Sequence, residues 1–186
     1  MIMKTYILLA EGFEEIEALI PNDILLRSGV ETVLVSISEQ KTVKSSHGVE
    51  VVANCCLSET DLSDGDMIFL PGGMPGSLNL ANCAPLAEYI KQYAEEGKWL
   101  AAICAAPLVL GRMGLLKGKN ATCYPSFEPE LLGANPLKKT CVRDGKIITG
   151  CGPGAASALG REMAEVLVGK EKADEVLKQM MFNVYE

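Results

Sequence analysis

The sequence predicts an α/β fold: a three-layer sandwich in which helices cover both faces of a mostly parallel sheet. Short apolar runs alternate with longer helical patterns along the chain, and such alternation is typical of parallel strands joined by helices. Glycines stand where the helical patterns stop, at Gly29, Gly97, Gly114 and Gly169, as expected for helix ends.

The elements follow from these runs in chain order. Strands are expected at Lys4–Leu9, Glu31–Ile37, Met67–Leu70, Leu100–Ile103, Ala121–Cys123 and Lys146–Thr149, with shorter extended pieces at Thr42–Lys44, Val49–Ala53 and Thr140–Arg143. Helices are expected at Glu14–Ser28, Pro85–Glu96, Pro107–Met113, Gly154–Val168 and Lys172–Met180. Pro21 lies inside the first helical pattern, so we expect it to kink or restart that helix.

Composition restricts the class of protein. A chain of 186 residues with 48% apolar residues suits a single globular domain spanning 1–186. Its net charge of −7 argues against a nucleic-acid-binding surface. No apolar run approaches the ~20 residues that cross a bilayer, and the first residues do not form a signal peptide. We therefore expect no membrane association.

Cysteine usage indicates the compartment and the cofactors. Seven cysteines, an odd number, favour a reducing cytoplasm over a disulfide framework. The cysteines form no Cys-x-x-Cys pair, and His47 is the sole histidine of the sequence. Zinc sites are usually marked by such paired ligands, so we expect neither a metal nor another cofactor.

Cys104 is the most informative residue. It ends the apolar run Leu100–Ile103 and is followed by Ala105, Ala106 and Pro107, where a helical pattern begins. A strand that turns sharply into a helix presents the turn residue at the carboxyl edge of the sheet. The pattern is that of a nucleophile elbow with cysteine in place of serine, and the helix N-terminus favours the thiolate. A buried cysteine acting as a small apolar side chain fits the octapeptide equally well.

Two further features lie at the carboxyl ends of predicted strands. Gly72 and Gly73 bring two backbone amides toward one point, which suits an oxyanion site, although a simple turn also uses such a pair. Glu17 shares a helix face with apolar residues at spacings of three and four, so we expect it to point inward; at the edge of that face it would reach solvent. A buried, protonated Glu17 donates a hydrogen bond to a cysteine sulfur and holds it as thiolate.

Four motifs occur together in one order: Glu14–Ala18 with Pro21–Asp23, Leu70–Gly73, Ala101–Pro107 and Gly152–Gly154. Through them the chain resembles, over essentially its whole length, the ThiJ/PfpI superfamily, in the branch of the human parkinsonism-associated protein deglycase and its bacterial homologues. The resemblance implies a flavodoxin-like fold and a homodimer. It matches Cys104 to the reactive, oxidation-prone cysteine and Glu17 to the protonated glutamate beside it. Gly73 and Ala105 match the backbone donors around the cysteine, with Gly72 next to them.

The chain also departs from its relatives. Many of them carry a histidine where this chain has Tyr124, and a phenol does not serve as a base near neutral pH. Proteolytic members place histidine directly after the cysteine, where this chain has Ala105, and amidotransferases need a later histidine that is absent here. Both activities are disfavoured. Cys151 stands where relatives often have arginine or glutamine, and is either a packing residue or a resolving thiol for oxidised Cys104.

Four residues are candidate substrate contacts: Tyr124, Cys151, Pro153 of the Gly-Pro-Gly motif, and Arg27. Arg27 is most simply a partner for the dipole of the first helix; the resemblance also places it near the site, where it would attract an anionic group. His47 is expected in a turn, and the resemblance places that turn near the dimer interface.

The resemblance implies one of two functions. As an enzyme, the Cys104 thiolate attacks a reactive aldehyde such as methylglyoxal, or its glycated adduct, while the amides of Gly73 and Ala105 meet the oxyanion and Glu17 moves a proton. This would be a glutathione-independent glyoxalase or a deglycase. As a non-enzymatic protein, Cys104 is a redox sensor whose oxidation is coupled to a stress or chaperone role. Because position 124 carries tyrosine where many relatives carry histidine, the enzymatic hypothesis is weakened and the redox-sensor hypothesis is not affected.

Overall fold

A seven-stranded sheet forms the middle layer of the structure, a computed structural model that describes residues 2–182. Its strand order is β10-β11-β7-β6-β1-β2-β5, and every neighbouring pair is parallel except β10 with β11. The strands are β1 (Lys4–Leu9), β2 (Glu31–Ser36), β5 (Cys55–Cys56), β6 (Met67–Leu70), β7 (Trp99–Ile103), β10 (Cys141–Asp144) and β11 (Ile147–Gly150). The predicted mostly parallel sheet is confirmed.

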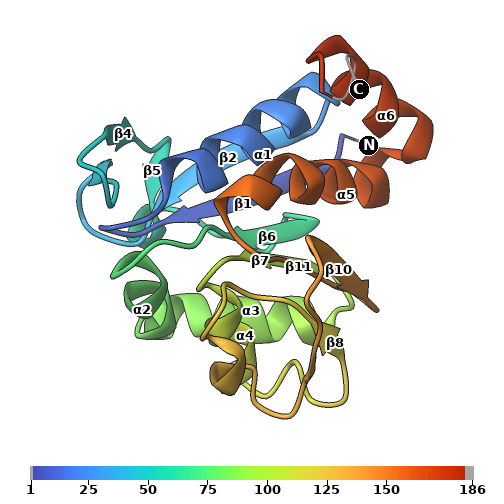
Figure 1. The fold of residues 1–186 in the computed structure, drawn as a ribbon. Helices are drawn as coiled ribbons and strands as arrows, with labels where there is room; N and C mark the ends of the chain where they lie inside the picture. Colours follow the sequence, from blue (N-terminus) through green and yellow to red (C-terminus); the bar gives the residue numbers. More distant parts are fainter. Residues whose placement is uncertain (1, 183–186) are drawn as a thin grey trace.

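Helices cover both faces of this sheet (Figure 1). One face carries α1 (Glu15–Arg27), α5 (Ala156–Val168) and α6 (Lys170–Gln179), and the other carries α2 (Gly76–Ala81), α3 (Ala84–Glu95) and α4 (Pro107–Arg112). Alternate residues of β1 serve the two layers, as a strand requires: Tyr6 and Leu8 join one buried cluster, Ile7 and Leu9 the other. The three-layer prediction is therefore confirmed.

Smaller elements lie outside the main sheet. A hairpin joins β3 (Thr42–Lys44) to β4 (Glu50–Val52), β8 (Asn120–Ala121) pairs in parallel with β9 (Asn135–Pro136), and 3-10 turns occupy Leu57–Glu59, Glu128–Glu130 and Pro153–Ala155. No helix among residues 2–182 is long and apolar enough to span a membrane.

The expected strand at Ala121–Cys123 is wrong in extent, because the strand there is β8 and ends at Ala121. Beyond that residue the backbone turns to other partners. The N–H of Thr122 donates to Thr149 Oγ1 at 3.0 Å, and the N–H of Tyr124 donates to the carbonyl of Cys104 at 2.8 Å. These bonds carry the segment toward the carboxyl edge of the main sheet.

Pro21 does not restart the first helix, since α1 continues through it from Glu15 to Arg27. Proline has no N–H for the carbonyl four residues earlier, so the carbonyl of Glu17 lacks its usual helical donor. Packing compensates for this loss. Pro21 is buried against α5, where a Cβ on Gly160 would stand 3.0 Å from Pro21 Cα. A glycine at position 160 therefore lets the two helices approach closely.

Replacing Gly111 by alanine should destabilise the fold. Gly111 lies in α4, and a Cβ there would collide with the backbone carbonyl of Glu130 and the Cα of Leu131. Overpacking against backbone costs about 1–3 kcal/mol, more than the ~1 kcal/mol by which alanine favours a helix. Urea denaturation should show a lower free energy of unfolding for Gly111→Ala.

The matched control is Gly154→Ala, because a Cβ at Gly154 has no neighbour within 4 Å. This variant should remain within about 0.5 kcal/mol of the wild type. Equal stability of the two variants would contradict the packing described for α4.

Candidate active site

Cys104 occupies a strained turn between β7 and α4. Its φ is 64°, in the left-handed region that side chains rarely adopt. Two backbone hydrogen bonds hold it there: its N–H donates to the carbonyl of Gly150 at 2.9 Å, and its carbonyl accepts from the N–H of Tyr124 at 2.8 Å. The cysteine elbow expected from the sequence is therefore present, with the thiol residue 9% exposed.

Glu17 lies in the first turn of α1, fully buried beside Cys104. Its Oε2 accepts a hydrogen bond from the N–H of Gly72 at 2.9 Å, and the Cys104 thiol lies close enough to lower the pKa of the carboxyl group against the effect of burial. Oε1 has no hydrogen-bond partner among the described residues. The prediction that Glu17 points inward is confirmed by this burial.

Burial and mutual repulsion both act against negative charge on Glu17 and Cys104. Burial raises the pKa of Glu17 to about 7, since a buried carboxylate loses its hydration. Burial is also the largest cause that raises the pKa of the Cys104 thiol, to about 12, followed by the charge of Glu17. The expectation of a thiolate at a helix N-terminus, drawn from the sequence, did not include the free-energy cost of burying the charged sulfur. With the proton on Glu17, the carboxylate charge no longer opposes the thiolate.

Backbone amides surround the sulfur. The backbone N–H groups of Gly73 and Ala105 lie close to the Cys104 thiol and lower its pKa, against the effect of burial. Both residues therefore lie where the sequence placed them. Gly72 does not, because its N–H is engaged by Glu17 and is not free for an oxyanion. Its role is to position the glutamate.

The other candidate contacts differ in their distance from the thiol. Tyr124 is joined to Cys104 through its backbone, and its ring lies against Gly152 with the residue 47% exposed. Cys151 is half-buried and packs against the apolar cluster that includes Cys104; the choice between packing residue and resolving thiol stays open. Pro153 begins the 3-10 turn that follows.

Arg27 is not brought to the cysteine within the chain. It lies ten residues beyond Glu17 on the same helix, about 15 Å along the axis at 1.5 Å per residue. Its guanidinium Nε instead donates to Asp23 Oδ2 at 2.8 Å on the exposed side of α1. The helix-dipole role fits this position, whereas direct contact with a substrate on Cys104 does not.

His47 lies in a turn, as expected, and contacts the start of α1. Its Nδ1 is 3.0 Å from Glu15 Oε1 and 3.4 Å from Glu14 Oε2, and these two carboxylates raise its pKa. The donor atoms of the three residues lie within 4.8 Å of one another, a spacing that a metal ion can also use. The sequence analysis did not anticipate this grouping, because His47 lies 32 residues beyond Glu15 in the sequence.

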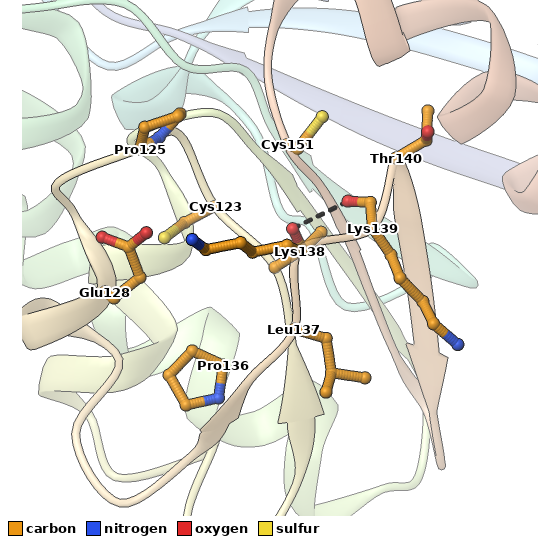
Figure 2. Close-up of a pocket in the computed structure, with 10 residues that line it drawn as sticks. Cys123, Pro125, Glu128, Pro136, Leu137, Lys138, Lys139, Thr140 and Cys151 are labelled. Atoms are coloured by element: carbon orange, nitrogen blue, oxygen red, sulfur yellow. Dashed lines mark hydrogen bonds between the residues drawn. The ribbon is translucent and has the colours of Figure 1, made fainter.

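A cavity of about 480 Å³, which we call the lateral cavity, lies beside the elbow (Figure 2). Its walls come from residues 122–123 and 136–140 together with Pro125, Glu128 and Cys151. The sequence analysis missed it, because no periodicity marks the irregular segments that build it. The Gly150 carbonyl that accepts the Cys104 N–H was also missed, because a sequence pattern places a strand but not the direction of a single hydrogen bond.

Comparison with known proteins identifies the family. The sequence model of the DJ-1/PfpI family matches residues 3–166 of this chain. This chain belongs to the DJ-1/PfpI family. Among solved structures, oxidised DJ-1 of Toxoplasma gondii superimposes with a TM-score of 0.93 at 35% identity, covering 97% of this chain and 99% of that one. The flavodoxin-like fold implied by the motifs is thereby confirmed.

Two curated relatives of this DJ-1/PfpI chain are informative. Protein DJ-1 homolog B of Arabidopsis thaliana is 42% identical over 175 residues, or 93% of this chain, which spans only 40% of that relative's length. Glutathione-independent glyoxalase DJR-1.2 of Caenorhabditis elegans is 33% identical over 172 residues, covering 91% of each chain.

Cys104 should be the fastest-reacting thiol of this DJ-1/PfpI protein. It alone among the seven cysteines combines a strained elbow, two amide donors and a buried carboxyl partner. Limiting iodoacetamide followed by mass spectrometry should find the first modification on Cys104. Faster labelling of the half-buried Cys55 or Cys141 would refute the assignment.

Glu17 should make the free energy of unfolding fall as the pH rises from about 4.5 to about 7. The unfolded chain loses the Glu17 proton near 4.5, whereas the folded protein keeps it until about 7, so deprotonation favours unfolding in that window. Urea titrations at intervals from pH 4 to pH 8 should show this fall in the wild type. In Glu17→Gln the same fall should be smaller, and identical pH profiles would overturn the raised pKa.

Proposed function

We propose that the protein detoxifies reactive aldehydes through Cys104, as a glutathione-independent glyoxalase or a deglycase of glycated adducts. One observation carries the proposal: a strained cysteine, two amide donors and a buried carboxyl of near-neutral pKa converge on one point. The family and the name of the Caenorhabditis elegans relative support it. A thiol nucleophile, an oxyanion site and a proton-transfer group are what addition to an aldehyde requires.

The first step is addition to the aldehyde. With the shared proton on Glu17, the Cys104 thiolate attacks the aldehyde carbon of methylglyoxal, and a carbon–sulfur bond forms. The carbonyl electron pair moves to oxygen, where the Gly73 and Ala105 amides stabilise it until Glu17 donates its proton. The product of this step is a neutral hemithioacetal beside an ionised Glu17.

The second step moves one proton between carbons. Ionised Glu17 removes the proton from the former aldehyde carbon, which gives an enediolate, and returns that proton to the neighbouring carbon. The hydroxyl proton on the first oxygen moves to the second oxygen, so the former ketone becomes an alcohol and the former aldehyde carbon becomes the carbonyl of a lactate thioester. Water then cleaves the carbon–sulfur bond and releases lactate and the Cys104 thiolate; one of the two protons set free returns to Glu17 and the other goes to solvent. A carboxyl pKa of about 7 suits this alternation, because a group near the working pH donates and accepts with similar ease.

Oxidation sensing is the second candidate function. His47 is the sole histidine of the chain, and it pairs with Glu14 and Glu15 and not with Cys104. No imidazole base therefore assists the thiol. The Glu17 carboxyl and the two amides would equally stabilise a Cys104 sulfinate, and this supports a redox-sensing or chaperone-like stress role. With either function, we propose that the protein is a homodimer and is located in the cytoplasm.

A methylglyoxal turnover assay separates the two functions. We expect the wild type to produce lactate and Cys104→Ser to produce none above background. Tyr124→Phe should retain most of the activity, because the contact between Tyr124 and the elbow is made by its backbone. If the phenol relays a proton, the loss should be on the order of 10²-fold.

Glu17→Gln completes the set as a variant that retains a hydrogen-bond donor. It should still react with iodoacetamide at Cys104 while losing turnover by about 10²-fold or more. If the wild type shows no turnover above Cys104→Ser, the enzymatic proposal fails and the sensor proposal replaces it.

A further inference from the structure

Two backbone hydrogen bonds connect the segments that form the walls of the lateral cavity to the elbow at Cys104. One wall includes Cys123 and Pro125, on either side of Tyr124, whose N–H donates to the Cys104 carbonyl. The other wall includes Cys151, which follows the Gly150 carbonyl that accepts the Cys104 N–H. Cys104 itself does not line the cavity, so a ligand there would occupy a separate site.

Two opposite charges face this space. Figure 2 shows the Lys138 ammonium extending toward the side of the cavity where the Glu128 carboxylate and the Cys123 thiol lie, whereas the Lys139 ammonium points away. The Glu128 carboxylate also acts on that thiol: burial, then the charge of Glu128, raises the pKa of Cys123 to about 11.

Neither of these two side chains forms an ion pair within the part of the chain that the structure describes, and Lys138 is exposed. The neighbouring Glu130 pairs with Arg112 at 2.8 Å, but no ion pair joins Glu128 to Lys138 or to another described residue. A ligand that carries both charges close together can bridge them.

The remaining walls are largely apolar. Pro125, Pro136 and Leu137 line the cavity beside the charged groups, and a volume of about 480 Å³ lies within the roughly 300–1,000 Å³ of small-molecule pockets. An apolar body with one ammonium and one carboxylate therefore matches the site in charge and in surface.

We propose that the lateral cavity binds a free α-amino acid with an apolar side chain. Lys138 receives its carboxylate, Glu128 receives its ammonium group, and the side chain packs against Pro125 and Pro136. This binding site is distinct from the Cys104 chemistry. Peptide ends do not satisfy it, because an N-terminal residue lacks the carboxylate and a C-terminal residue lacks the ammonium group.

Isothermal titration of the intact protein with L-leucine tests this assignment. We expect one leucine per chain, with unchanged affinity in Cys104→Ser, so the result does not depend on turnover. Glu128→Gln and Lys138→Gln should each weaken binding about tenfold or more, since each removes a charge-assisted hydrogen bond. Lys139→Gln is the matched control and should bind as the wild type does.

Analogues of leucine apply the same test to the unaltered protein. N-acetyl-leucine lacks the ammonium group and leucinamide lacks the carboxylate, so each should bind about tenfold more weakly than leucine. Glycine should also bind more weakly, because it has no side chain for the apolar walls. Absence of leucine binding at millimolar concentration, or equal binding of leucine and both analogues, would overturn the proposal.

Discussion

The candidate active site depends on the absence of a side chain at Gly72. A Cβ on this residue would stand 2.5 Å from the Cβ of Cys104, 2.5 Å from Glu17 Oε2 and 2.7 Å from the carbonyl of Ile103. The backbone of Gly72 also fixes α1, because its N–H donates to Glu17 and its carbonyl accepts from the N–H of Glu14. One glycine thus lets the end of β6, the start of α1 and the elbow after β7 meet.

This meeting has an electrostatic consequence. Glu17 and Cys104 lie together out of water, so a second negative charge is opposed by both burial and repulsion. A charge on Glu17 raises the pKa of the Cys104 thiol, so a proton on Glu17 favours a nucleophilic sulfur. The amides of Gly73 and Ala105 favour the sulfur anion, while the Gly72 amide favours charge on Glu17.

The sequence was sufficient where a local pattern determines position. Cys104 follows an apolar strand and precedes Pro107, and Glu17 shares a helix face with apolar residues at spacings of three and four, so both could be located. The direction of a single N–H is not encoded in this way, and Gly72 was therefore assigned to the oxyanion when it serves Glu17. The continuity of α1 through Pro21 depends on its packing against Gly160 of a distant helix. The lateral cavity depends on loops that no periodicity marks.

This arrangement bears on the absence of a histidine beside Cys104. In the described structure His47 lies against the solvent side of α1, 64% exposed at its side chain, whereas Glu17 occupies the buried side of the same helix. An imidazole near the thiol would stabilise a thiolate by its own charge. Without it, a thiolate here depends on neutral donors and on a carboxyl that keeps its proton. If Cys104 acts as we propose, the burial of Glu17, which is costly for a carboxylate, is what allows a reactive cysteine in the absence of a base.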